Sequence, residues 1–264
     1  MPHEITPVQL RLTALRDFPI VQKGDDLFEQ ILKCLKREKI SLVQNDILII
    51  AHKIVSKAEG RLKNLKDVHP STKAVELAKK VQKDPRLVEL ILSESKSIIR
   101  QKPGVLIVEH KQGWIMANAG IDASNVSSEK GQENVLLLPA NPEKTAANLR
   151  SKFLLNSGPD IAIVISDSFG RPWRIGTTGV AIGSAGLPSV WDRRGEPDLF
   201  DNELKVTQQA IGDEVATAAA LLQGQAAEGL PVVHLRGLDF SHHASAFDRP
   251  AKDLIRNPEE DMFR

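Results

Sequence analysis

The stretch DILIIAHKIV (residues 46–55) decides the fold class of this chain. It is a short continuous apolar run rich in isoleucine, which predicts a strand buried within a sheet. Three further runs predict strands: VQLRLTAL (8–15), DIAIVIS (160–166), which ends at Asp167, and LPVVHLRG (230–237). GVLIVEH (104–110) and GWIMAN (113–118) flank KQG and predict a hairpin.

Helical patterns separate these strands. Each of four predicted helices begins at a cap or a first-turn proline. Asp25 caps residues 25–38, Ser71 caps 72–81, Asp84 with Pro85 opens 85–98, and Asn141 with Pro142 opens a helix that reaches about Asn156. A fifth, alanine-rich helix is expected from Glu203 to about Gln223. Helices mixed with a hairpin and apolar strands predict an α+β protein.

Bulk composition limits the functional classes. The 264 residues carry a formal charge of +1, which gives no global reason to expect nucleic acid or a membrane surface as partner. The single cysteine, Cys34, is expected in the core, and the chain has no leader-like or membrane-spanning apolar run, so we expect a cytoplasmic protein. We expect one unit over 1–264, in which any subdomains join non-contiguous segments, with a polar tail over 241–264.

Two stretches offer oxygen ligands. NAGIDASN (118–125) is either a hydrogen-bonded turn or a set of oxygen donors around Asp122 for Mg²⁺ or Mn²⁺. ISDSFGRPWR (165–174) places Asp167 and Ser168 at a strand end, followed by Arg171 and Arg174. This pattern fits either a helix cap with surface arginines, or a cation site beside a phosphate site.

Two other stretches could contact a nucleotide. In AHKIVSKAEG (51–60), the lysines at 53 and 57 follow a buried strand, and they either face solvent in a loop or contact phosphates. QGQAAEGLP (223–231) is either an ordinary connection or a turn that approaches a ligand closely. GTTGVAIGSAG (176–186) is small and flexible, and close backbone packing explains it better than a phosphate cradle does. Aspartates, basic residues and a glycine turn together suit metal-assisted phosphoryl transfer.

Seven strings in order carry a family resemblance: IVSKAEGR, NAGIDASNV, LLP, SDSFGRPWR, GVAIGSAGLP, DRRGEPDLFDNEL and GQAAEGLPVVHLRG. They resemble the coenzyme F-420:L-glutamate ligase family, also called F-420-0:γ-glutamyl ligases, from about Phe18 to Leu238. The resemblance implies a ligase that uses GTP and divalent metal to add L-glutamate to a deazaflavin precursor, with release of GDP and phosphate. It also implies an intertwined homodimer with an uncommon mixed-sheet fold. Some relatives carry a nitroreductase-like domain, and we expect none here.

The resemblance also implies site residues. Asp122, Asp167 and Ser168 resemble metal ligands, and Gln225 stands where some relatives have a glutamate ligand. The implied cofactors are two Mg²⁺ or Mn²⁺ ions, with a monovalent cation as a further candidate. The implied GTP contacts are Phe18, Pro19, Ile20, Val21, His52, Lys53, Lys57, Asn125, Gln223, Gly224, Gln225, Ala226, Ala227, Glu228, Gly229 and Leu230. His52 and Lys53 replace small hydroxyl residues of some relatives.

A carboxylate needs activation before an amine can attack it, so an acyl phosphate is the expected intermediate. Lys57, with Arg171 or Arg174, is a candidate to hold phosphates or the acidic substrate, and no general base is evident. Two alternatives stay open: a related amide ligase with a different carboxylate acceptor, and a nucleotide-binding protein without ligase activity.

Overall fold

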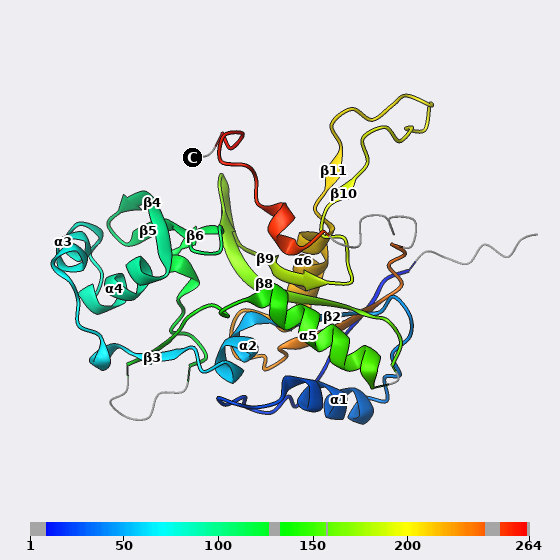
Figure 1. Cartoon of the computed structure of the whole chain (residues 1–264), viewed down its shortest axis with the longest axis horizontal. Coiled ribbons are helices and arrows are strands. Elements are labelled where there is room, and N and C mark those ends of the chain that lie inside the picture. The colour runs from blue at the N-terminus through cyan, green and yellow to red at the C-terminus, as the bar shows by residue number, and fades with distance from the viewer. Residues whose placement is uncertain (1–8, 127–132, 157, 241–248, 263–264) are drawn as a thin grey trace, which may run out of the picture.

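A computed structural model describes residues 9–126, 133–156, 158–240 and 249–262 (Figure 1). It shows a mixed α+β protein, as the sequence predicts. Part of the predicted polar tail, residues 241–248 and 263–264, lies outside the described residues. None of the helices within the described ranges is long and apolar enough to cross a membrane.

A five-stranded sheet forms the centre of the fold. Its order is β1-β12-β2-β8-β9, and every neighbouring pair is antiparallel except β2 and β8, which run parallel. The four residues from Ile47 to Ile50 are fully buried, which explains their apolar run. The strands are β1 (Arg11–Ala14), β12 (Val232–Arg236), β2 (Ile47–Ala51), β8 (Ala162–Arg171) and β9 (Arg174–Ala185).

The buried strand predicted over 46–55 is shorter than expected. β2 ends at Ala51, and the following residues form helix α2 (His52–Ala58) instead of continuing the strand or entering a loop. His52, Val55 and Ser56 are buried together, which is the spacing of one helix face. The prediction was wrong here because the isoleucine run hides the change of period at residue 52.

The strand predicted over 160–166 is longer than expected. β8 continues past Asp167 to Arg171 and forms a two-stranded ribbon with β9. Its parallel neighbour β2 stops at Ala51, opposite Ser166, so Asp167 is the first residue beyond the parallel pair. Asp167 therefore lies inside a strand, yet still at the edge where ligands collect in such sheets.

The small residues of β9 allow helices to approach closely. A Cβ atom at Gly179 would lie 2.3 Å from the carbonyl oxygen of Ala216 in α6, and one at Gly183 would lie 2.5 Å from the carbonyl carbon of Pro142 in α5. The segment GTTGVAIGSAG is thus a packed strand and not a flexible loop, and the expectation of close backbone packing is confirmed. The three long helices around this sheet are α1 (Leu27–Arg37), α5 (Pro142–Leu155) and α6 (Ile211–Gln223).

Helix starts were predicted with mixed success. Side chains of Ser71, Asp84 and Asn141 cap α3 (Thr72–Val81), α4 (Pro85–Ser93) and α5 as expected. The cap of α1 is Asp26, whose Oδ1 accepts from the Phe28 amide at 2.9 Å, and not Asp25. Cys34 of α1 is buried, as predicted.

Helix α6 begins at residue 211 and not at Glu203. The preceding residues form a projecting hairpin, β10 (Trp191–Asp192) with β11 (Gln208–Gln209) (Figure 1). Asp198 Oδ1 accepts from the amides of Phe200 and Asn202, which closes the turn at the hairpin tip. Such local capping competes with helix formation.

A second hydrophobic cluster lies to one side of the main sheet (Figure 1). Two helices pack there against a three-stranded antiparallel sheet, and the predicted hairpin at KQG is confirmed. The helix expected over 85–98 ends at Ser93 and gives way to a strand. The elements are α3 (Thr72–Val81), α4 (Pro85–Ser93), β4 (Ser95–Lys102), β5 (Val105–His110), β6 (Ile115–Ala117) and the connecting pair β3 (Leu62–Asn64) and β7 (Asn134–Leu136).

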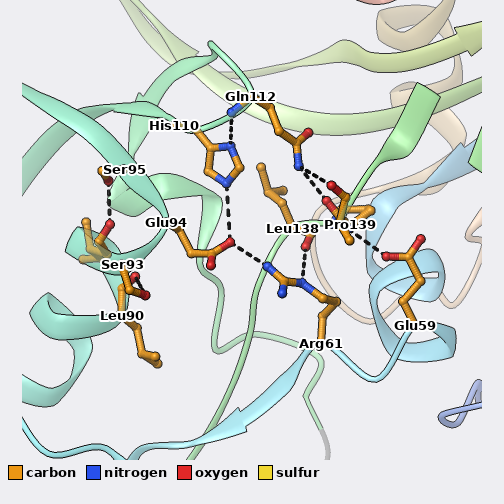
Figure 2. A network of polar contacts seen from close by, with 12 residues as sticks. Glu59, Arg61, Leu90, Ser93, Glu94, Ser95, His110, Gln112, Leu138 and Pro139 are labelled. Carbon is orange, nitrogen blue, oxygen red and sulfur yellow. Dashed lines mark hydrogen bonds and ion pairs between the residues drawn. The ribbon is translucent and has the colours of Figure 1, made fainter. Parts of the chain in front are cut away.

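A polar network joins the two clusters (Figure 2). Arg61 Nη2 lies 2.6 Å from Glu94 Oε2, and Arg61 Nε donates to the Leu138 carbonyl at 2.9 Å. His110 Nε2 lies 3.7 Å from the same Glu94 oxygen. Burial would raise the pKa of Glu94, but the His110 and Arg61 contacts outweigh it and hold the pKa below its ordinary value.

Candidate functional site

A cavity of about 590 Å³ opens where β2 and β8 end. Its walls come from the stretch before α1, the start of α2, the middle of β8, the end of α6 and the loop that leads to β12. A volume of this size is in the range of small-molecule sites. Predicted site residues from distant parts of the chain meet here: Phe18, Pro19, Ile20, Val21, His52, Lys53, Lys57, Asn125, Asp167, Ser168, Gln223, Gly224, Gln225, Ala226, Ala227, Gly229 and Leu230.

Helix α2 contributes the basic wall. Because β2 ends at Ala51, the helix starts at the mouth of the cavity, and its first residues face inward. Lys53 and Lys57 are four residues apart, so both ammonium groups extend from one face of α2. His52 is 2% exposed, and its Nε2 lies 3.2 Å from Asp167 Oδ1.

Strand β8 contributes the acidic group. Asp167 Oδ1 also accepts from the Ser168 amide at 2.7 Å, and no described residue hydrogen-bonds to Oδ2. Ser166 Oγ lies 3.5 Å from Gln223 Oε1, which connects the strand to the end of α6. One oxygen of Asp167 is thus fixed by the protein and the other is available to a ligand.

Asp122 sits in a hydrogen-bonded turn beside the cavity and does not line it. Its Oδ1 accepts from the Ser124 amide at 2.6 Å, and its Oδ2 lies 2.7 Å from Lys53 Nζ. Burial would raise the pKa of Asp122, but hydrogen bonds from Lys53 and Ser124 outweigh it and lower the pKa below the ordinary value. Locally the turn interpretation is confirmed, and the turn is tied to α2.

Asn125 bridges two walls. Its side-chain Nδ2 donates to the Ala226 carbonyl at 2.7 Å, and its own carbonyl accepts from Lys57 Nζ at 2.8 Å. Burial lowers the pKa of Lys57, and the nearby Lys53 charge lowers it further. Asn125 therefore connects α2, the 121–126 turn and the 224–230 loop around the cavity mouth.

Contacts within the 224–230 loop stabilise its conformation. Gly224 has φ +70°, and a Cβ atom there would lie 2.0 Å from Glu228 Cδ. Glu228 Oε2 accepts from the Ala226 amide at 2.8 Å, so this carboxylate supports the loop and does not line the cavity. The positive φ favours glycine at 224, whereas the Glu228 side chain could move away from a larger residue.

Arg171 and Arg174 lie away from the cavity. They are paired with each other at the exposed tip of the β8–β9 ribbon, next to a register shift at Gly170. The cavity is instead lined by residues that the sequence did not single out: Ala51, Ile54, Val126, Ser166, Ala220 and Pro231. Ser166 was detectable in principle, since it belongs to the same ISDS string as Asp167.

The donor set fits a divalent ion that arrives with a phosphorylated ligand. The described part of the chain contains no group of three or more His, Cys, Asp or Glu side chains that could hold a metal. Asp167, Ser168 and Gln225, which carry side-chain oxygens, nevertheless line the cavity. Mg²⁺ commonly takes one or two carboxylates and completes its shell with water and substrate phosphates, so a protein-only cage is not required.

Comparison with known proteins gives a consistent result. The family model described as F420-0:Gamma-glutamyl ligase matches residues 16–237. The Coenzyme F420:L-glutamate ligase of Methanopyrus kandleri is 44% identical over 244 residues, which cover 92% of this chain and 93% of that protein. Proteins with the same name from Methanothermobacter thermautotrophicus and Archaeoglobus fulgidus are 41% and 35% identical, and the matches cover 97% of this chain in both cases and 99% and 97% of those proteins.

Proposed function

The chain belongs to the F420-0:gamma-glutamyl ligase family, and from this membership we propose that it joins L-glutamate to a deazaflavin coenzyme precursor at the expense of GTP. The observation that supports this most is the cavity at the end of the parallel pair β2 and β8. It combines two lysines, a carboxylate with a free oxygen and a glycine-containing loop in one place. These groups suit the phosphates of a nucleotide and a metal that accompanies them.

The proposed reaction has two steps. A carboxylate oxygen of the precursor attacks the γ-phosphorus of GTP, the bond to the β–γ bridging oxygen breaks, and GDP leaves. The α-amine of L-glutamate then attacks the carbonyl carbon of the acyl phosphate, the carbon–oxygen bond to phosphate breaks, and inorganic phosphate leaves. The amine loses a proton as the amide forms, and that proton passes to the departing phosphate or to water.

The residues around the cavity have distinct proposed roles. Lys53 and Lys57 bind nucleotide phosphates, and Asn125 with the 224–230 loop positions the nucleotide. Asp167, Ser168, Gln225 and Asp122 are the proposed ligands of two Mg²⁺ or Mn²⁺ ions, which when bound would offset charge on the phosphate oxygens. Since the amide of Gln225 is neutral, the ion beside it is expected to bind more weakly. A monovalent cation and a cytoplasmic location remain predictions of the sequence.

We further propose a homodimer. Large apolar side chains are exposed on the two projecting ribbons: Ile175 near the tip of β8–β9, and Leu199, Phe200 and Val206 on the β10–β11 hairpin. Exposed apolar groups gathered on projecting elements favour burial against another subunit. Light scattering on the purified chain tests this, with twice the chain mass expected.

Nucleotide turnover tests the ligase proposal. Purified protein is incubated with GTP, Mg²⁺ or Mn²⁺, L-glutamate and the deazaflavin precursor, and GDP is measured. Sustained GDP formation should require both the precursor and L-glutamate, and Asp167→Asn should reduce it on the order of 100-fold. Asp67→Asn, a change of an exposed aspartate outside the cavity, is the matched control. Wild-type turnover in Asp167→Asn would refute the assigned role.

A further inference from the structure

Lys53 already occupies the oxygens that the sequence offers to a cation near Asp122. Its Nζ lies 2.7 Å from Asp122 Oδ2 and donates to Ser124 Oγ at 2.8 Å. Ser124 Oγ in turn donates to Asp122 Oδ2 at 2.9 Å, and Asp122 Oδ1 accepts from the Ser124 amide. Both carboxylate oxygens of Asp122 are therefore satisfied by the chain itself.

Asp167 is in a different state. Its Oδ2 has no hydrogen bond from any described residue. Asp167 also lines the cavity, whereas Asp122 does not. The two carboxylates are thus unequal: Asp167 is open to an incoming ion, whereas Asp122 carries a tethered ammonium group. Asp122 Oδ2 already accepts from Ser124 Oγ and contacts the Lys53 ammonium, so both of its lone pairs are used and a metal ion can bind there most readily if the ammonium moves away.

The side chain of Lys53 is able to move into the cavity. It is 26% exposed and lines the cavity, and four flexible carbons carry the charge. Lys57, one turn along α2, is fixed differently because its ammonium donates to the backbone carbonyl of Asn125. Among the described residues, Lys53 contacts a carboxylate and Lys57 does not.

We propose that Lys53 is an exchangeable counter-ion, which holds Asp122 while the site lacks metal and moves onto the phosphates of the nucleotide when a divalent ion takes its place. The exchange rests on the proposed use of a nucleotide and metal by this cavity. It couples the two ligands: metal binding frees an ammonium for phosphate, and phosphate draws that ammonium away from Asp122. By linkage, each ligand must then raise the affinity for the other by the same factor.

Mn²⁺ binding, followed by electron paramagnetic resonance on the full chain, tests this without turnover. For wild type we expect weak binding alone and binding on the order of tenfold tighter with saturating GDP. Lys53→Met should bind Mn²⁺ alone several-fold more tightly than wild type, because Asp122 no longer has a resident cation, and the gain with GDP should largely disappear. Lys53→Arg keeps a cation there and should bind Mn²⁺ alone as weakly as wild type.

Lys57→Met is the matched control, since it removes a lysine that contacts only a backbone carbonyl among the described residues. It should not strengthen Mn²⁺ binding in the absence of nucleotide. If Lys53→Met leaves Mn²⁺ affinity unchanged or lower, the exchange is refuted even when ligase activity is present. If Lys53→Met binds Mn²⁺ more tightly and loses the GDP effect while the wild-type protein shows no ligation, the exchange stands and the proposed reaction fails.

Discussion

His52 Nε2 lies 3.2 Å from Asp167 Oδ1, and this contact joins the first residue of α2 to the strand that carries the open carboxylate. Both residues come directly after the point where the parallel pair β2 and β8 ends. The histidine is buried and Asp167 lines the cavity, so this contact fixes the Asp167 carboxylate relative to α2.

Removal of this histidine should impair catalysis more than folding. We expect His52→Ala to lower kcat by roughly 10- to 100-fold, because Asp167 loses the group that orients it. His52→Gln retains an N–H donor and should keep more activity. Steady-state kinetics with thermal unfolding as a control make the comparison, and a kcat above half of wild type in His52→Ala would contradict the positioning role.

Asn125 should control nucleotide affinity. Asn125→Asp keeps the size of the side chain but loses the donor to the Ala226 carbonyl. We expect KM for GTP to rise by about tenfold while kcat changes less. A tenfold change corresponds roughly to the free energy of one lost hydrogen bond, and the new carboxylate would also face the Ala226 carbonyl. An unchanged KM would show that the bridge between the two loops is not needed for nucleotide binding.

The network in Figure 2 should make stability depend on pH. The pKa of Glu94 is lowered in the folded state, so its contribution is present above its ordinary value of 4.5 and is lost as the pH falls through the folded pKa. We expect Glu94→Gln to cost about 2 kcal/mol of unfolding free energy at pH 7, since Arg61 loses its partner. The difference from wild type should shrink below about pH 4.5.

Urea unfolding at pH 7 and at pH 3.5 measures this change. Glu76→Gln, on the exposed face of α3, is the control and should show no such dependence. A cost for Glu94→Gln that is equal at both pH values would show that the ion pair does not stabilise the contact between the clusters.

Close packing of α6 on β9 should make Gly179 intolerant of a side chain. Gly179→Ala places Cβ against the Ala216 carbonyl, so we expect a loss of about 2 kcal/mol and a fall in Tm of roughly 5 °C. Gly170 lies in the paired strand β8 and makes a matched control, because a Cβ atom added there would have no heavy atom within 4 Å. Calorimetry of the two alanine variants gives the comparison, and equal Tm values would contradict the packing argument.

Much of the fold is readable from local chemistry. Caps at Ser71, Asp84 and Asn141 identify helix starts because each side chain accepts a backbone amide nearby, as the structure shows. Apolar runs identify the buried strands because a strand that is covered on both faces is built almost entirely from apolar residues. The errors occur where tertiary contacts decide, as in β8, which extends to Arg171 only because β9 pairs with it.

The site was only partly readable. The strings around Asp167, Lys57 and 223–230 indicate the residues that line the cavity, but single strings do not show which side chains turn inward. Glu228 bonds to its own loop, and Arg171 lies at a ribbon tip. Their positions depend on a glycine angle and on strand pairing, and neither is visible in the residue types alone.

Isotope transfer tests the central claim most directly. The deazaflavin precursor, labelled with ¹⁸O in the carboxylate that accepts glutamate, is incubated with the protein, GTP, L-glutamate and Mg²⁺, and both products are analysed by mass spectrometry. The account predicts a glutamyl amide and one ¹⁸O atom in the inorganic phosphate, since an acyl phosphate passes its bridging oxygen to phosphate. Absence of the amide, or phosphate without label, would contradict it.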